Sequence, residues 1–317
     1  MENKYWNPVV DQTTLKLRAE LLRNVRQFMN EAGIMEVETP LLGSATATDP
    51  NICSLETRLH TESDSKLYLQ TSPEFHMKRL LAAGSGPIFQ ISRAFRDEES
   101  GRYHNPEFTL LEWYRPGFDH HELMNEIESL LVYLGLHKPV RISYADIFLE
   151  ATGHDPHSIS QEELTKLARD GGLSPAVQDH NELLDFVFNH YVISRLKDKG
   201  NVFVFDFPET QAALARLSEG EPVTAARFEL FMQGLEIANG FHELCDLSEQ
   251  KQRFESDLQQ RSKQNKAIYP IDRNLLSALE SGLPESAGVA LGLDRLLMIM
   301  SKASHIREVL AFPIDRA

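Results

Sequence analysis

The sequence predicts an α+β fold in which an antiparallel sheet is flanked by helices. Two pairs of predicted strands, 88–96 with 107–114 and 228–232 with 235–237, are each joined by a turn, which favours antiparallel pairing. Segments with apolar residues at helical spacing lie between these strand pairs and around them. Strand pairs separated by helices are typical of α+β domains.

The size and composition of the chain are those of an ordinary globular protein. Its 317 residues can bury one large core or two modest ones, and 42% of them are hydrophobic and 25% charged. No internal repeat or low-complexity linker divides the chain. We therefore expect a single domain over 1–317, with a mostly helical insertion at about 136–200.

Charge and terminal sequence restrict the class of function. With 32 basic and 47 acidic residues the net charge is −15, which argues against a large nucleic-acid footprint. No apolar run approaches the roughly 20 residues that span a bilayer. The N-terminus lacks a basic-then-apolar targeting pattern, so we expect a cytoplasmic protein. Cys53 and Cys245 lack metal-ligand spacing, which indicates neither a disulfide framework nor a zinc site.

The elements of the N-terminal half are predicted from periodicity and stop signals. A helix over 15–32 ends before Gly33, and a short strand over 34–39 ends at Pro40, which cannot donate to a ladder. Pro73 lies in the first turn of the next helix. The other elements predicted here are a strand at 66–71, a helix at 74–83, and strands at 88–96 and 107–114.

Helical patterns dominate from 120 to about 199, and the C-terminal part returns to mixed structure. The elements predicted after the helical region are a strand at 201–207, the hairpin that begins at 228, helices at 248–266 and 273–281, a strand at 286–291 and a helix at 293–300.

The hairpin carries three acids, Glu229, Glu236 and Glu243, at intervals of seven residues. If 233–234 is the two-residue loop, Glu236 lies opposite Phe231 and on the face of Glu229, with the two Cα atoms about 7–8 Å apart. Two carboxylates at that separation suit hard cations that also contact phosphates. The alternative is a hairpin whose acids are solvated on its outer face.

Glu243 would face the opposite way in an unbroken strand, because it is an odd number of residues from Glu236. A bulge at 239–240 could turn its side chain back toward the same pocket.

Two further segments can carry chemistry. In the turn and strands at 95–114, Arg96 could fork onto a phosphate and Phe108 could stack on a base. The alternative is a charged hairpin tip. The segment 288–295 runs from strand into helix with two glycines, which let a ligand approach the backbone closely. Its alternative is a tight strand-to-helix junction.

Together these segments resemble the signatures of class II aminoacyl-tRNA synthetases: 37–40 matches motif 1, 95–114 motif 2 and 288–295 motif 3. The strings HNPEF and ANGFHEL resemble the lysyl-tRNA synthetase branch. The resemblance covers 15–135 and 227–317, and it implies a class II synthetase-like antiparallel sheet flanked by helices.

A lysyl-tRNA synthetase carries an anticodon-binding barrel before its catalytic domain, and the residues before Leu15 are too few to form one. The chain therefore resembles the truncated paralogous family of elongation factor P lysine lysyltransferases. That resemblance implies that ATP and Mg²⁺ are used to activate lysine, preferentially (R)-β-lysine, as an aminoacyl-adenylate. The lysyl group would then pass to a lysine side chain of elongation factor P. A homodimer is implied as well, with neither tRNA nor a membrane as partner.

The resemblance also implies roles for single residues. Arg96 would bind the α-phosphate and the substrate carboxylate, and Phe108 and Arg295 would hold the two faces of adenine, so that Arg96 and Arg295 are the catalytic pair. Glu229 and Glu236 would hold Mg²⁺. The remaining residues implied to bind ATP are Asp97, Glu98, Asn105, Ile237 and Gly292, with Glu236 shared.

For the amino acid, the resemblance implies that Glu243 and Tyr114 bind the distal ammonium and that Glu74 binds the other amine. The remaining residues implied to bind the amino acid are Ser72, Pro73 and Ala290. Ser72 and Ala290 stand where lysyl-tRNA synthetases usually have alanine and glycine, which favours the ligase. Asp97 departs from the usual asparagine of its motif.

Two alternatives stay open from the sequence. A tRNA-charging enzyme like lysyl-tRNA synthetase would share every motif. A non-catalytic regulatory paralogue that binds an amino acid would be expected to lack Arg96, Arg295 or the paired acids, and all of these are present.

Overall fold

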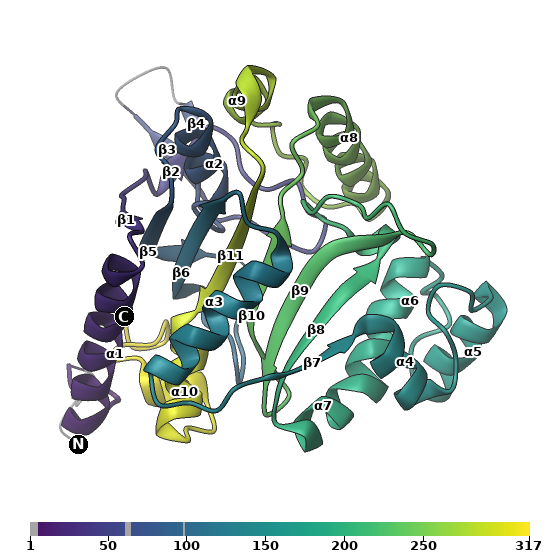
Figure 1. Cartoon of the computed structure of the whole chain (residues 1–317), viewed down its shortest axis with the longest axis horizontal. Coiled ribbons are helices and arrows are strands. Elements are labelled where there is room, and N and C mark those ends of the chain that lie inside the picture. Colours follow the sequence, from purple (N-terminus) through teal and green to yellow (C-terminus); the bar gives the residue numbers. More distant parts are fainter. Residues whose placement is uncertain (1–5, 61–64, 98) are drawn as a thin grey trace. The chain divides into compact units, whose positions relative to one another are not determined.

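The computed structural model describes residues 6–60, 65–97 and 99–317, which form two compact units (Figure 1). The first unit comprises 1–117 and 244–317, and the second comprises 118–243. Within the described residues, no helix is both long and apolar enough to cross a bilayer. Both units combine helices with a sheet, so the α+β prediction is confirmed.

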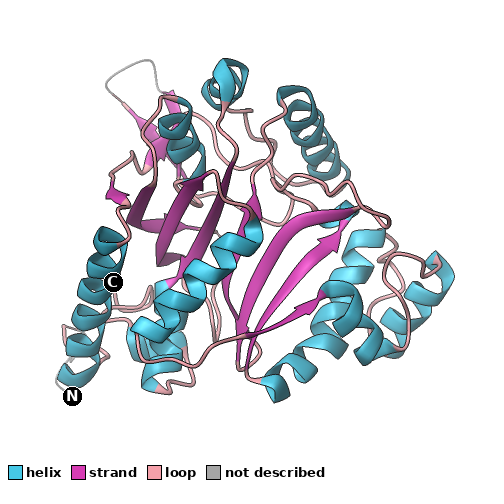
Figure 2. Ribbon diagram, viewed as in Figure 1, coloured by secondary structure: helices cyan, strands magenta, loops and turns pink. Residues whose placement is uncertain are grey.

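The first unit contains two sheets with helices around them (Figure 2). The larger sheet has the strand order β1-β5-β6-β11; β1 runs parallel to β5, and the other pairs are antiparallel. The smaller sheet has the order β2-β4-β3 and is antiparallel. The helices of this unit are α1 (Gln12–Glu31), α2 (Glu74–Ala82), α8 (Leu247–Lys263), α9 (Arg273–Gly282), α10 (Leu293–Ser301) and the 3₁₀ helix η3 (Ile306–Val309). The strands are β1 (Met35–Glu36), β2 (Leu42–Gly43), β3 (Glu56–Leu59), β4 (Ser65–Leu69), β5 (Ile88–Phe95), β6 (Glu107–Pro116) and β11 (Ser286–Gly292).

Helix α1 begins three residues before the predicted start, because Asp11 caps it by accepting a hydrogen bond from the backbone N–H of Thr14. It ends as predicted before Gly33, whose φ of +70° lies in the left-handed region that glycine adopts without strain. The predicted strand at 34–39 is only two residues long.

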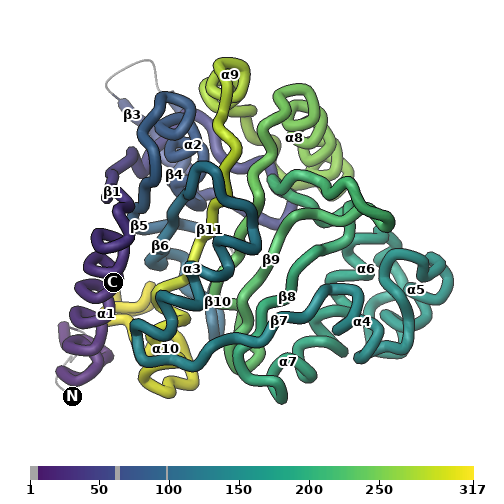
Figure 3. The backbone as a smooth tube through the Cα atoms, viewed as in Figure 1, coloured from purple at the N-terminus to yellow at the C-terminus, as the bar shows by residue number. Residues whose placement is uncertain are grey.

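One face of the larger sheet in the first unit is apolar and mostly buried. Opposing residues of β5, β6 and β11 share this face: Phe89, Trp113 and Val289 in one row, and Ile91, Leu111 and Leu291 in the next. Helix α10 packs against β6 and α1, and Figure 3 shows α1 and α10 side by side. The residues that alternate with these rows form the other face, which carries polar side chains.

The second unit has a sheet of strand order β10-β9-β8-β7, antiparallel except for the parallel pair β7 and β8. Its helices are α3 (His120–Tyr133), α4 (Tyr144–Thr152), α5 (Gln161–Asp170), α6 (His180–Val187), the π-helix η1 (Phe188–Val192), α7 (Ile193–Lys199) and the 3₁₀ helix η2 (Glu209–Gln211). The strands are β7 (Val140–Ser143), β8 (Asn201–Pro208), β9 (Thr224–Met232) and β10 (Leu235–His242).

Strand β7 lies within the region 120–199, where helical patterns dominate the sequence, and was not predicted. Its four residues are too few to show a period of two, and they become a strand by pairing with β8. Tyr144, the first residue of α4 and the next after β7, stacks on the ring of Phe188 with the two centroids 5.0 Å apart. The centroid of Phe207 also lies 5.0 Å from that of Tyr144. These rings form the centre of the core of the second unit.

Asp257 of α8 gives the stability of the first unit a pH dependence. Burial raises its pKa from 3.8 to about 6, although the hydroxyl of Thr48 donates to its Oδ2 at 2.7 Å. Because the folded state holds this proton more tightly than the unfolded chain does, Asp257 lowers stability progressively as pH rises from about 4 to 6.

We therefore expect Asp257→Asn, which can still accept from Thr48, to raise the free energy of unfolding at pH 7.5 by on the order of 2 kcal/mol, and by less at pH 5. Urea unfolding monitored by tryptophan fluorescence measures this change, because Trp6 and Trp113 both belong to the first unit. An equal effect at both pH values would contradict the assignment.

Candidate active site

The polar face of the first unit's sheet is suited to bind a small polar ligand. Glu112 of β6 lies between Gln90 of β5 and Ala290 of β11, and both polar side chains are buried. The hydroxyl of Tyr114 donates to Oε1 of Glu112 at 2.9 Å. On this face β11 contributes Ser286, Gly288, Ala290 and Gly292, of which only the small Ala290 lies directly opposite Glu112, so little side-chain volume stands beside the acid. A buried carboxylate beside such a strip suits a ligand that carries an amine.

Arg96 and Phe108 come together at the end of the same face. Phe108 pairs with Ala94, two residues before Arg96, so the alternation of β5 brings the guanidinium over the ring, 5.2 Å from its centroid. Nη1 of Arg96 is 3.5 Å from Glu99, and its buried Nε has no hydrogen-bond partner among the residues the structure describes. A buried cationic donor in this state favours an anionic ligand.

The other described residues of this turn form hydrogen bonds that fix the conformation of the loop. The side chain of Asn105 is buried; its Nδ2 donates to the carbonyl of Glu107 at 2.6 Å, and its Oδ1 accepts from the backbone N–H of Ile314 at 3.1 Å. The backbone N–H of Asp97 donates to the carbonyl of Cys53 at 2.8 Å. Glu98, which the sequence assigns to ATP, lies outside the described residues.

The start of α10 is fixed by buried charges. Gly292 is the N-cap and offers no side chain. Asp294 is buried, pairs with Nη2 of Arg18 at 2.6 Å and accepts from the backbone N–H of Thr109 at 2.7 Å. Nη2 of Arg295 lies 2.6 Å from Nε2 of His104, so this arginine rests against the turn that follows Arg96.

The segment Ser72-Pro73-Glu74 forms the start of α2. Pro73 is the N-cap, and Oγ of Ser72 accepts from the backbone N–H of Glu74 at 3.0 Å. Oε1 of Glu74 pairs with Nζ of the buried Lys78 at 2.7 Å. The carboxylate assigned to a substrate amine therefore has a cationic partner of its own within α2.

The hairpin of the second unit forms as predicted at its loop. Gln233 and Gly234 have φ of +54° and +78°, which fits a type I′ turn, and Glu236 lies opposite Phe231. Glu229 and Phe231 are two residues apart in β9, so Glu229 and Glu236 share a face. Arg227 donates to Glu229 from the same strand.

Burial raises the pKa of Glu229 to about 7; Arg227 opposes that shift, and the nearby Glu236 adds to it.

The bulge of β10 differs from its predicted position. The register shifts between Glu236 and Ala238, so the extra residue is Ile237 rather than the 239–240 pair, because Asn239 is already back in register opposite Glu229. The alternation that follows puts 239, 241 and 243 on the face of Glu236. The bulge thus places Glu243 on the face of Glu236, although it occurs two residues earlier in the chain than expected. Glu243 is buried, and its backbone forms an isolated β-bridge with Ala215.

Two polar residues at these sites were not among the predicted ones. Glu112 could have been found by counting in steps of two from Phe108, which places it on the same strand face. Arg227 stands two residues before Glu229, and the same count indicates it. Ile237, predicted to bind ATP, is a buried apolar residue of the bulge.

Comparison with known proteins gives a consistent result over the whole chain. Residues 6–316 match the family model described as tRNA synthetases class II (D, K and N). The chain is 46% identical over 324 residues to a protein of Vibrio cholerae serotype O1 named elongation factor P–(R)-beta-lysine ligase, with 100% of both chains covered. Proteins of the same name from Photobacterium profundum and Haemophilus influenzae are also 46% identical. These matches cover 98% and 99% of this chain and 99% and 98% of the relatives.

Proposed function

Because the chain belongs to the family of tRNA synthetases class II (D, K and N), we propose that it is an ATP-dependent ligase that activates lysine and attaches it to elongation factor P. The observation that carries this proposal is the 46% identity, over the full length of both chains, to a protein named elongation factor P–(R)-beta-lysine ligase. The preferred amino acid is (R)-β-lysine, and the acceptor is a lysine side chain of the factor. The charge of −15 supports a protein acceptor over tRNA.

The proposed reaction has two steps. The carboxylate of lysine attacks the α-phosphorus of ATP, which forms an aminoacyl-adenylate and releases pyrophosphate. The amine of the acceptor lysine then attacks the acyl carbon, an amide bond forms, and AMP leaves. Arg96 is proposed to neutralise the charge that develops in the first step, and its buried Nε supports that role. Phe108 and Arg295 are proposed to hold adenine.

Glu229 and Glu236 are proposed to hold Mg²⁺. They are hard oxygen donors on one face of the hairpin, and the raised pKa of the buried Glu229 indicates a site where added positive charge is stabilising. They therefore fit the ion, which would supply positive charge to the phosphates when bound.

The amino acid is proposed to lie on the polar face of the first unit's sheet. Glu112, joined to Tyr114 by a hydrogen bond, stands opposite Ala290 there, which supports an amine-binding role for this face. Glu243 is proposed to bind the distal ammonium. A homodimer stays a prediction from the resemblance, and a cytoplasmic location stays a prediction from the N-terminal sequence.

We expect Ala290→Gly to increase the rate of adenylate formation with α-lysine relative to β-lysine. In α-lysine the amine and the carboxylate share a carbon, so a methyl group beside that carbon crowds the α-amine more than a β-amine. One misplaced methyl is worth about 1–3 kcal/mol, or roughly 10–200-fold in discrimination. Pyrophosphate exchange with each isomer measures the ratio. An unchanged ratio in a folded variant would assign selectivity elsewhere, with Ser72 as the next candidate.

The function itself is tested by incubating the purified protein with ATP and (R)-β-lysine or (S)-α-lysine, in the presence of elongation factor P or bulk tRNA. Mass spectrometry should show elongation factor P heavier by one lysyl group, placed on one lysine by peptide mapping. Acid-precipitable radiolabel on tRNA should stay at the level without enzyme. Charging of tRNA with no change in elongation factor P would favour the synthetase alternative. Adenylate formation without either product would contradict both acceptors.

A further inference from the structure

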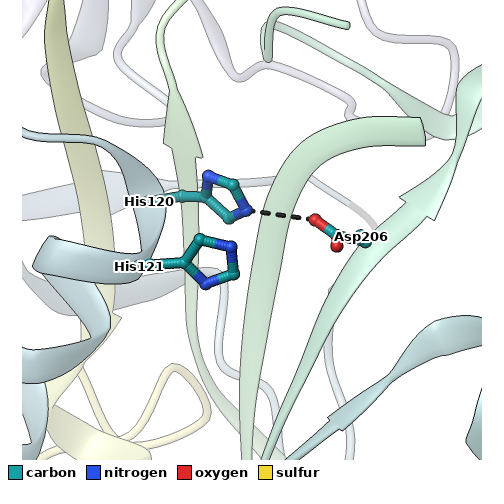
Figure 4. A group of neighbouring side chains, drawn as sticks. All are labelled: His120, His121 and Asp206. Carbon is teal, nitrogen blue, oxygen red and sulfur yellow. Dashed lines mark hydrogen bonds and ion pairs between the residues drawn. The ribbon is translucent and has the colours of Figure 1, made fainter. Parts of the chain in front are cut away.

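Two histidines and an aspartate gather within the second unit, where α3 faces β8 (Figure 4). Nε2 of His120 lies 3.1 Å from Oδ1 of Asp206, and the rings of His120 and His121 have centroids 4.0 Å apart. One ligand atom from each of the three residues lies within 4.8 Å of the other two. His120 is buried, and His121 and Asp206 are partly exposed, so the cluster is reached by solvent on one side.

Local structure on both elements brings the three side chains together. His120 and His121 are the first two residues of α3, directly after Asp119, whose side chain caps the helix in a capping box with Glu122. Nε2 of His120 contacts Asp206 of β8, and the ring of His121 contacts Phe205 of the same strand.

Asp206 reaches α3 because β8 departs from regular strand geometry at this residue. The register of β8 with β9 shifts between Phe205 and Phe207, with the extra residue on β9, and Asp206 itself has a φ of +56°. Phe205 and Asp206 thus both contact α3, since the ring of Phe205 lies 5.4 Å from that of His121. A left-handed backbone at a residue other than glycine has an energetic cost and is common at functional positions.

The charged groups that face His121 are Asp206 and Asp119, which are acidic, and Arg141, which is basic. The guanidinium of Arg141 is directed elsewhere, since it donates to Oδ1 of Asn125 at 2.6 Å.

The separation of His120 and Asp206 is close to that in a tetrahedral site. With metal–nitrogen and metal–oxygen bonds of about 2.0–2.2 Å, neighbouring ligand atoms in a tetrahedron lie roughly 3.3–3.5 Å apart. The separation of 3.1 Å between His120 and Asp206 is already close to that value, so an ion can replace the shared proton with little movement of either side chain.

We propose that His120, His121 and Asp206 bind one divalent transition-metal ion, with zinc as the best match to two imidazoles and a carboxylate, and with water as the fourth ligand. The ion would join the start of α3 to Asp206 of β8. This site uses none of the residues proposed above for ATP, Mg²⁺ or lysine.

The test is a titration of the chelator-treated protein with Zn²⁺ by calorimetry. We compare the wild type with His121→Gln, with Asp206→Asn and with the double variant. Asparagine tolerates the positive φ at 206 and can still accept from His120, so Asp206→Asn should remain folded. His137→Gln is the matched control, because His137 is an exposed histidine of the same unit.

The wild type and the His137 variant should bind one Zn²⁺ more than the double variant, with each single variant weakened at least about 10-fold. Replacing Zn²⁺ by Co²⁺ should give the intense visible absorption of a tetrahedral site in the wild type and not in the double variant. Equal Zn²⁺ stoichiometry and affinity in the wild type and a folded double variant would overturn the proposal, as would an equal loss in the His137 variant.

Discussion

Replacing Arg96 by alanine is expected to lower the rate of ATP–pyrophosphate exchange about 10²–10³-fold, the usual effect of removing one donor that stabilises transition-state charge. The guanidinium lies over Phe108, and its buried Nε has no hydrogen-bond partner among the described residues. The described part of the protein therefore shows no stronger interaction that would give this side chain a purely structural role. The same feature predicts that the fold survives the change. Exchange kinetics measure the first expectation, and circular dichroism measures the second.

Two variants sharpen this experiment. Arg96→Lys keeps the charge and loses the planar fork, so its rate should fall between those of the wild type and the alanine variant. Arg93→Ala removes the same charge from the other face of β5, where the side chain is 46% exposed, and should leave exchange within a few-fold of wild type. Near-normal exchange in a folded Arg96→Ala protein would remove Arg96 from the site.

Asp294→Asn is expected to lower the free energy of unfolding of the first unit by about 3 kcal/mol, because removing one partner of a buried ion pair leaves the other charge uncompensated. Asp294 is 2% exposed, and its two oxygens serve Arg18 of α1 and the backbone of Thr109 in β6. The side chain thus joins α10 to both elements. Since Arg295 is its neighbour, pyrophosphate exchange should fall as well.

Urea unfolding followed by the fluorescence of Trp6 and Trp113 measures the loss in the first unit. Asp315→Asn is the matched control, since the ion pair of Asp315 with Arg307 at 2.8 Å is about half exposed and should contribute at most about 1 kcal/mol. If the Asp294 and Asp315 variants lose equal stability, Asp294 does not hold α10 in place.

Much of the fold could be predicted because it depends on residues that are neighbours in the chain. The loop at Gln233-Gly234 sets the register of β9 and β10, so the pairing of Glu236 with Phe231 was predicted and is confirmed. The strands β5 and β6 and the helices α1, α2 and α10 follow from periods and stop signals, within a few residues at their ends.

The candidate site, too, could be predicted in part from residues that are neighbours in the chain. The motifs placed Arg96 and Phe108 at the end of one strand pair, and strand alternation brings them into contact. The roles assigned to these residues, and to Glu229, Glu236, Glu243 and the others, stay predictions. The partners of Glu74 and Asn105 could not be predicted, because a side chain's hydrogen bonds depend on which segments pack around it.

What the sequence by itself determined is the class of fold, the hairpin register and the strand faces, since turns and periodicity act between residues close in the chain. Only the tertiary structure decided the position of the bulge at Ile237, the strand β7, and the pairing of Arg18 with Asp294 and of His120 with Asp206. The physical reason is that each of these depends on packing between distant elements: a buried charge is stable only where a partner meets it, and no local pattern records that partner.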